Sequence, residues 1–179
     1  DCLLSRGLGD VYKRQPKALK KINNEYVAAH FGKWGIGSNP KTLGYDNSDG
    51  PTKNKDGGFV NDRTQWNHVS LEDPKNIFSL TQKAVDFMEK NSNEKKPFYL
   101  QISHYAVHAS IQSKEETFLK QAKKPLGAQH INPGFAAMTE DLDEGLGIIL
   151  DKIKQLGIED NTYVISVSYT HLTLPTKRI

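Results

Sequence analysis

The chain has 179 residues and a mass of 20.1 kDa, which suits one ordinary domain with a hydrophobic core but not two large ones. Residues 1–15 and 168–179 hold five basic and two acidic residues, which account for the whole net charge of +3. The interior is therefore neutral and gives no electrostatic support to nucleic-acid binding. No apolar run reaches the length of a membrane span, and the single Cys2 excludes both a disulfide framework and a cysteine-rich zinc site.

The predicted elements begin at Pro16. Residues 16–24 have the spacing of a short helix, and residues 25–31 form a short strand candidate. A polar loop rich in Gly, Asn and Asp follows over residues 32–70, and a loop of this length in a compact domain is usually functional or disordered. Asp73-Pro74 is a typical helix start, which predicts a helix over residues 74–90.

Four further elements complete the pattern. The apolar run 97–103 indicates a buried strand of a parallel sheet. Ser113 and Glu116 have the spacing of a capping box before a short helix, and a longer helix is expected over residues 133–156. Residues 162–166 predict a last strand.

The alternation of strand and helix predicts an α/β fold, with a mainly parallel sheet flanked by helices. Crossovers between parallel strands are right-handed, so the helices should cover the sheet faces. The expected sheet contains the strands near residues 25–30, 97–103 and 162–166, with the helices 74–90 and 133–156 packed on it.

The first candidate functional segment is residues 30–37, which the strand 25–31 leads into. Ligands of open α/β sheets bind at the carboxyl ends of the strands. The glycines allow close approach of the backbone, Lys33 offers a compact cation, and Trp34 offers a flat wall. The spacing of a P-loop is absent. A solvated lysine in a glycine-rich loop is the alternative.

The second candidate segment carries His104 and His108, directly after the strand 97–103. Histidines at the mouth of a parallel sheet can donate to an anion, move a proton or bind a metal. Their spacing indicates zinc only on a helix, and Tyr105 stands where the zinc motif has glutamate, so no metal ligand is assigned. Two hydrogen-bonded structural histidines are the alternative.

Acidic residues gather at two places. The loop 44–50 lacks the spacing of an EF-hand calcium site, which favours solvated turn residues. The second group lies on the predicted helix 133–156 and is expected to form a polar face with one hydrogen bond to a loop. Its members are Glu140, Asp141, Asp143 and Glu144.

Together these segments resemble the sulfatase family of the alkaline-phosphatase superfamily, from about residue 16 to residue 166. HFGKWGIG is similar to the family's Gly-Lys-Trp-His-x-Gly block, and PFYLQISHYAVHA is similar to its strand that ends in an active-site histidine. The segment from Ile131 to Ile165 is similar to the helix and strand that precede its second metal-binding segment. The resemblance implies part of an alkaline-phosphatase-like domain. The site residues that it implies are Lys33 and His108 as catalytic, with His104 and Trp34 binding substrate.

The resemblance also implies a formylglycine nucleophile and a calcium ion in the full-length parent. No metal ligand is identifiable, because Val167-Ser168-Tyr169 follows the last strand where the family has Ser-Asp-Asn-Gly. Gly35 stands where many members carry a histidine that contacts the anion. The stretch from Cys2 to Arg6 mimics the formylglycine motif but has Leu4 in place of its proline.

Both ends resemble translated adapter or read-through sequence. We therefore expect a non-native leader at residues 1–15, a partial sulfatase catalytic domain at 16–167 and a non-native tail at 168–179. The chain is expected to be an inactive fragment of a periplasmic or secreted parent that hydrolyses sulfate esters of small molecules or glycans. A phosphoester or phosphonate hydrolase of the same superfamily and a non-catalytic anion- or glycan-binding remnant are the alternatives.

Overall fold

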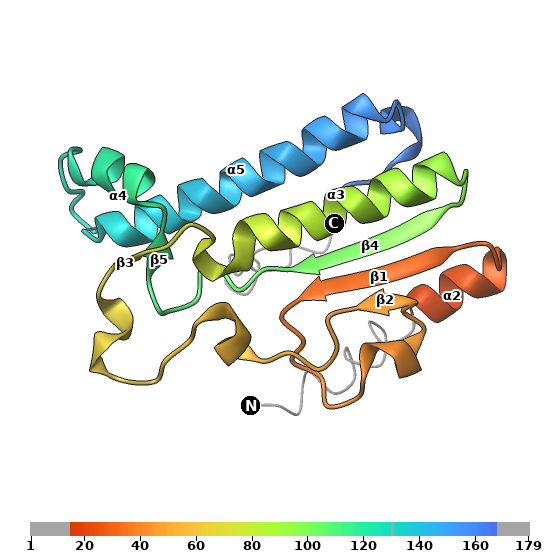
Figure 1. Ribbon diagram of the computed structural model, residues 1–179, viewed down its shortest axis with the longest axis horizontal. Helices are drawn as coiled ribbons and strands as arrows, with labels where there is room; N and C mark the ends of the chain where they lie inside the picture. Colours follow the sequence, from red (N-terminus) through yellow and green to blue (C-terminus); the bar gives the residue numbers. More distant parts are fainter. Residues whose placement is uncertain (1–14, 130, 168–179) are drawn as a thin grey trace, which may run out of the picture.

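The computed structural model describes residues 15–129 and 131–167. Its centre is a parallel sheet with the order β2-β1-β4, formed by β2 (Asn47–Ser48), β1 (Val27–Gly32) and β4 (Phe98–Ser103) (Figure 1). The pairing of β1 with β4 runs from Val27 opposite Phe98 to Gly32 opposite Ser103. Two of the three predicted strands and their parallel arrangement are thus confirmed.

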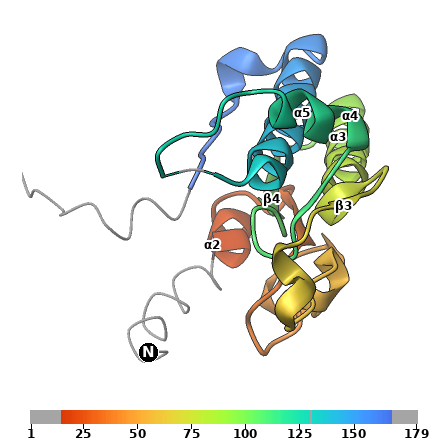
Figure 2. The same cartoon turned by 90° about the vertical axis from the view of Figure 1, so that its left-hand side faces the viewer.

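The helices cover the two faces of this sheet. Helix α3 (Ile77–Asn93) packs on β1 and β4, and α5 (Pro133–Gln155) packs on α3. Figure 2 shows α3, α4 (Glu115–Ala122) and α5 on one side of β4, with α2 (Gln15–Ile22) on the other. The helices predicted at 16–24, 74–90 and 133–156 are confirmed. None of the described helices is both long and apolar enough to cross a bilayer.

Strand β1 is buried because it contributes side chains to both faces. Ala29 and Phe31 join Leu80 and Phe87 of α3 in one core cluster. Ala28, one position out of phase, belongs to a second cluster on the opposite face, together with Trp34 and Tyr45. Successive side chains of a strand point to opposite faces, so this central strand reads as a continuous apolar run.

The predicted strand at 162–166 is wrong. Residues 162–167 follow a 3-10 turn (Glu159–Asn161) and belong to no strand, and the sheet order ends at β4. Tyr163 is 97% exposed and Ile165 is 84% exposed. Apolar, β-branched residues favour an extended chain, but a strand also needs a neighbouring strand to take up its backbone hydrogen bonds.

The start of α3 differs from the prediction by one turn. Pro74–Asn76 forms a separate 3-10 turn, because Lys75 and Asn76 both adopt left-handed backbone with φ of 54°. Asp73 still caps the helix, since its Oδ1 accepts the N–H of Phe78 at 2.8 Å. The left-handed turn places the side chain of Lys75 in the interior, where it is 1% exposed.

Lys75→Met is expected to raise the free energy of unfolding by roughly 1–3 kcal/mol at pH 7. Burial lowers the pKa of Lys75 from 10.5 to about 8, and no described carboxylate forms an ion pair with it. The unfolded chain therefore binds the proton of Lys75 more tightly than the folded chain. The buried ammonium group destabilises the fold fully below pH 8, and this destabilisation decreases as the pH rises towards 10.5. Urea unfolding at pH 7 and pH 9.5 measures the gain, which should be smaller at the higher pH. A loss of stability at pH 7, relative to the exposed Lys41→Met, would contradict this.

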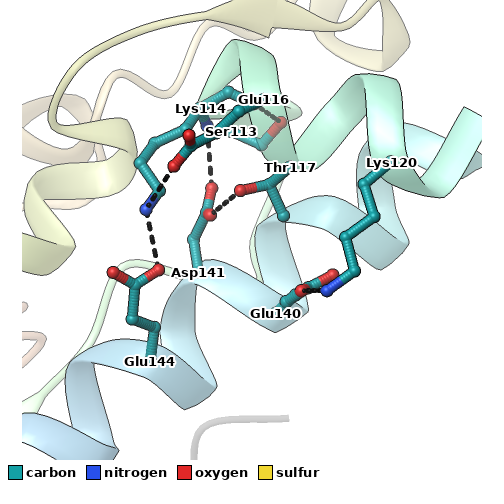
Figure 3. A network of polar contacts seen from close by, with 8 residues as sticks. All are labelled: Ser113, Lys114, Glu116, Thr117, Lys120, Glu140, Asp141 and Glu144. Carbon is teal, nitrogen blue, oxygen red and sulfur yellow. Dashed lines mark hydrogen bonds and ion pairs between the residues drawn. The ribbon is translucent and has the colours of Figure 1, made fainter.

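Helix α4 is capped by another helix rather than by its own sequence. The predicted capping box is wrong, because Lys114 is the N-cap and the hydroxyl of Ser113 donates to the Lys114 carbonyl instead. Asp141 of α5 is fully buried and accepts the N–H of Lys114 at 2.8 Å and the hydroxyl of Thr117 at 2.7 Å (Figure 3). This is the predicted hydrogen bond from the acidic group to a loop.

Asp141→Ala is expected to lower the free energy of unfolding by about 2–4 kcal/mol, because the change leaves the partly buried N–H of Lys114 and the buried hydroxyl of Thr117 without an acceptor. Asp143→Ala removes an exposed carboxylate from the same helix and should change stability by less than about 0.5 kcal/mol. Urea denaturation of both variants checks the difference. Equal effects would mean that Asp141 does not hold α4 to α5.

Candidate functional site

The carboxyl ends of β1 and β4 form one edge of the sheet, because Gly32 lies directly opposite Ser103. Lys33 follows Gly32, and His104 follows Ser103. The N–H of Lys33 donates to the Ser103 carbonyl at 2.7 Å, which extends the ladder by one bond. The two predicted functional segments therefore leave the sheet side by side, at the edge where α/β proteins bind ligands.

Gly32 permits this close approach. Its φ of +93° lies in the left-handed region, and a Cβ at this position would lie 2.2 Å from the carbonyl oxygen of Ser103. Asp49 fixes the turn from outside, since its Oδ2 accepts the N–H of Gly32 at 2.9 Å. The backbone geometry at position 32 therefore requires glycine.

The backbone on both sides of Lys33 is held by one hydroxyl. Oγ1 of Thr52 accepts the N–H of Trp34 at 2.8 Å and donates to the carbonyl of Gly32 at 2.5 Å. The side chain of Lys33 is half-buried and forms no ion pair with a described carboxylate. A lysine with a fixed backbone and an ammonium group without a described ion-pair partner is suited to binding an external anion.

Trp34, predicted to face substrate, lies in the core. It is 6% exposed, and its indole N–H donates to the Ser38 carbonyl at 2.7 Å. Its ring packs edge-on against His30, with centroids 4.6 Å apart, and against Tyr45 at 5.8 Å. In the described residues this ring serves packing, and contact with substrate stays a prediction.

His104 turns its ring inward. Both ring nitrogens are buried and have no hydrogen-bond partner among the described residues. Burial lowers the pKa of His104 to about 4, so the imidazole is neutral near pH 7. A neutral imidazole can donate one hydrogen bond and accept one, which agrees with a supporting role in binding rather than with that of a cation.

The ring of His108 is exposed. The residue lies at the end of a turn, where its backbone N–H donates to the backbone carbonyl of Tyr105 at 3.0 Å. The Nδ1 atom lies 2.7 Å from the carbonyl oxygen of Ala109. A carbonyl oxygen can only accept, so Nδ1 carries the hydrogen and Nε2 remains available to a ligand. Convergence of Lys33 and His108 on one anion, with their nitrogens roughly 5–8 Å apart, stays a prediction.

His30 is a supporting residue that the sequence does not reveal. Its Nε2 lies 3.0 Å from the hydroxyl of Ser103, which ties β1 to the last residue of β4. Burial, partly opposed by the charge of Asp49, lowers the pKa of His30 to about 4. His30 is separated from Ser103 by 73 positions, and only the register of the sheet brings the two side chains together.

The carboxylates near this edge already have protein partners. Asp46 binds Lys20 and the N–H of Ala28, and Asp49 binds Lys83 as well as Gly32. Within residues 15–129 and 131–167 there is no group of three His, Cys, Asp or Glu that could hold a metal. These residues do not fit a calcium site. Cys2, Arg6 and the segment 168–171 lie outside the described residues.

The carboxyl edge of this parallel sheet carries a lysine and two nearby histidines, at the place where α/β proteins bind their ligands. The Sulfatase family profile matches residues 12–168, which is most of the sequence. The chain belongs to the sulfatase family.

Similar proteins agree with this assignment. A sulfatase of Formosa agariphila is 32% identical over 99 residues, covering 50% of this chain and 18% of the relative. The human N-acetylgalactosamine-6-sulfatase is 27% identical over 184 residues, covering 90% of this chain and 33% of the relative. The solved structure of Ps i-CgsB shares the fold, with a TM-score of 0.58 and 23% identity over 82% of this chain and 37% of that one. The chain thus spans a third or less of the curated relatives it matches.

Proposed function

We propose that the complete protein to which this chain belongs hydrolyses sulfate esters of sulfated sugars. The observation that carries the proposal is the register of β1 with β4, which brings Lys33 and the turn 104–108 to one edge in a member of the sulfatase family. Two of the similar proteins support a sugar substrate. One is named N-acetylgalactosamine-6-sulfatase, and the structure of the other was also solved with k-i-k-neocarrahexaose.

Lys33 would bind the sulfate group. Its ammonium can donate to sulfate oxygens and stabilise the negative charge that develops during transfer. The carbonyl of Gly32 and the N–H of Trp34 are held by Thr52, so the lysine would meet the anion without reorganisation of its backbone. Its half-buried position strengthens the interaction, because charges attract more strongly where water is partly excluded.

His108 would supply a proton to the leaving group. In the imidazolium form, Nε2–H donates its proton to the oxygen of the breaking S–O bond, and the ring returns to the neutral state. The Ala109 carbonyl accepts from Nδ1–H in both states, so it fixes which nitrogen gives up the proton.

We also propose calcium and a formylglycine nucleophile for the complete protein, both supplied by residues other than those described, and a periplasmic or secreted location. Residues 16–167 would then form part of its catalytic domain. These proposals follow the pattern of the family. Loss of turnover on chelation, and cell fractionation of the tagged protein, test the metal and the location separately.

The test of the function is turnover by the complete protein, produced together with a formylglycine-generating enzyme. Sulfated galactose oligosaccharides and an aryl sulfate are compared with the matching aryl phosphate. Release of sulfate at the higher kcat/KM supports the proposal. Faster phosphate release would instead assign a phosphoester hydrolase. Binding of the oligosaccharide without turnover of any ester would assign a glycan-binding protein.

A further inference from the structure

One loop segment touches both candidate loops of the site. Residues 52–59, called here the 52–59 segment, include the 3-10 turn Asn54–Gly57 and belong to the long polar loop after β1. The segment contacts the backbone around Lys33 at one end and the ring of His108 at the other. Because Lys33 follows β1 and His108 follows β4, it connects two loops that the sheet alone leaves independent beyond its edge.

Thr52 acts on the first loop. Its single hydroxyl bonds the residues immediately before and after Lys33, as acceptor for Trp34 and as donor to Gly32. Two backbone hydrogen bonds from one side chain fix the direction in which the intervening lysine leaves the chain. Neither bond involves the ammonium group, so Thr52 leaves Lys33 free to bind a ligand.

Gly57 and Phe59 act on the second loop. Gly57 is buried against the ring of Tyr105, where an added Cβ would lie 2.2 Å from the nearest ring carbon. Tyr105 is 4% exposed, and its backbone carbonyl accepts the backbone N–H of His108. Tyr105 therefore anchors the turn that carries the histidine. The ring of Phe59 packs edge-to-face with the imidazole of His108, with centroids 4.9 Å apart. This contact closes one side of an otherwise exposed ring.

The 52–59 segment is itself fixed to the core. Asp56 closes the 3-10 turn by accepting the N–H of Lys53 at 2.6 Å. The side-chain amide of Asn76, at the start of α3, donates to the Asp56 carbonyl at 2.7 Å. Since α3 packs on β1 and β4, this bond fixes the position of the segment relative to the sheet from which the two loops extend.

We propose that the 52–59 segment is a positioning element that sets Lys33 and His108 in one arrangement, through Thr52 and Phe59, without itself contacting substrate. The inference rests on the proposed function for its kinetic consequence. Its structural content, the fixing of two side chains by one segment, is independent of the reaction. Misplacement of a reacting group by about 1 Å can cost 10²-fold in rate, so such an element has a measurable effect.

Thr52→Val in the complete protein removes both hydrogen bonds and keeps the shape of the side chain. It is expected to lower kcat by about tenfold to a hundredfold with little change in KM, and Thr52→Ser should restore most of the loss. Thr42→Val is the matched control, since the hydroxyl of Thr42 makes one bond within an exposed turn, to the Asn39 carbonyl at 2.7 Å. In a Lys33→Ala background, Thr52→Val should have little further effect, because the group it positions is gone.

Phe59→Leu tests the second contact. It is expected to lower kcat by about tenfold with recovery in Phe59→Tyr, and to have little further effect when His108 is already alanine. Phe118→Leu is the matched control. The ring of Phe118 stacks on His68 with centroids 3.8 Å apart, and these two residues lie outside the candidate site.

A readout without turnover separates this inference from the proposed function. Amide hydrogen exchange at Trp34 should accelerate in Thr52→Val and recover in Thr52→Ser, and the imidazole resonances of His108 should move in Phe59→Leu but not in Phe118→Leu. If the wild-type protein hydrolyses no ester but these signals behave as stated, the function fails and the positioning stands. Unchanged signals, or equal kinetic losses with and without Lys33 and His108, would overturn the inference.

Discussion

Lys33→Ala and His108→Ala are each expected to lower kcat for sulfate-ester hydrolysis by about 10²–10³ in the complete protein, which is the usual cost of losing one preorganised donor. Lys33 forms no ion pair with a described carboxylate, and Nε2 of His108 has no hydrogen-bond partner among the described residues, so under the proposed function each change removes a group that contacts the ligand. Steady-state kinetics with an aryl sulfate measures the loss. Under the proposed function the two groups act on one transferring anion, so the double variant should lose less than the product of the single losses.

Lys41→Ala supplies the control for charge, because Lys41 is an exposed lysine in the 3-10 turn Pro40–Leu43. Its kcat should equal that of the wild type. If Lys33→Ala left kcat unchanged, or raised only KM, Lys33 would not stabilise the transition state. The same outcome for His108→Ala would assign the proton to another donor.

Gly32→Ala is expected to destabilise the protein by more than about 3 kcal/mol and to abolish turnover, because the new Cβ meets backbone that cannot move without breaking the sheet. That Cβ would lie 2.2 Å from the Ser103 carbonyl oxygen, which also accepts the N–H of Lys33. The left-handed φ of Gly32 adds strain for any side chain. Urea unfolding gives the loss of stability.

Gly35→Ala is the matched comparison. A Cβ at Gly35 meets nothing within 4 Å, so this change should alter the free energy of unfolding by less than about 0.5 kcal/mol. Similar destabilisation by both substitutions would show that glycine is needed throughout the loop for flexibility. The expected contrast would locate the requirement at the sheet edge alone.

Local patterns predicted the main elements of the fold well. The apolar runs gave β1 and β4, and helical spacing gave α3 and α5, because these signals depend on which side chains must be buried. The prediction of a strand at 162–166 was wrong because its residue types indicate only a preference for an extended chain. Formation of a strand also depends on a neighbouring strand to pair with. The capping box at Ser113 failed for a similar reason, since the distant Asp141 satisfies the first N–H of that helix.

The candidate site was predictable only in its lysine and histidine residues. Lys33 and His108 stand in recognisable motifs directly after strands, but the residues that hold them do not. Thr52 and Phe59 lie in a polar loop without periodicity, and their partners are far away in the sequence. Trp34 shows the converse, because a motif position predicted to face substrate is occupied by a buried ring.

The parallel pairing of β1 with β4 also governs when the site can form during folding. The contact between His30 and Ser103 spans 73 positions, with α3 and the whole polar loop between them. Closing so long a connection costs chain entropy before any ladder bond is gained, so topologies of this kind fold slowly. During synthesis, Lys33 leaves the ribosome well before the histidines that complete its edge. The candidate site therefore forms only once β4 has docked, and until then the apolar residues of β1 depend on α3 for cover.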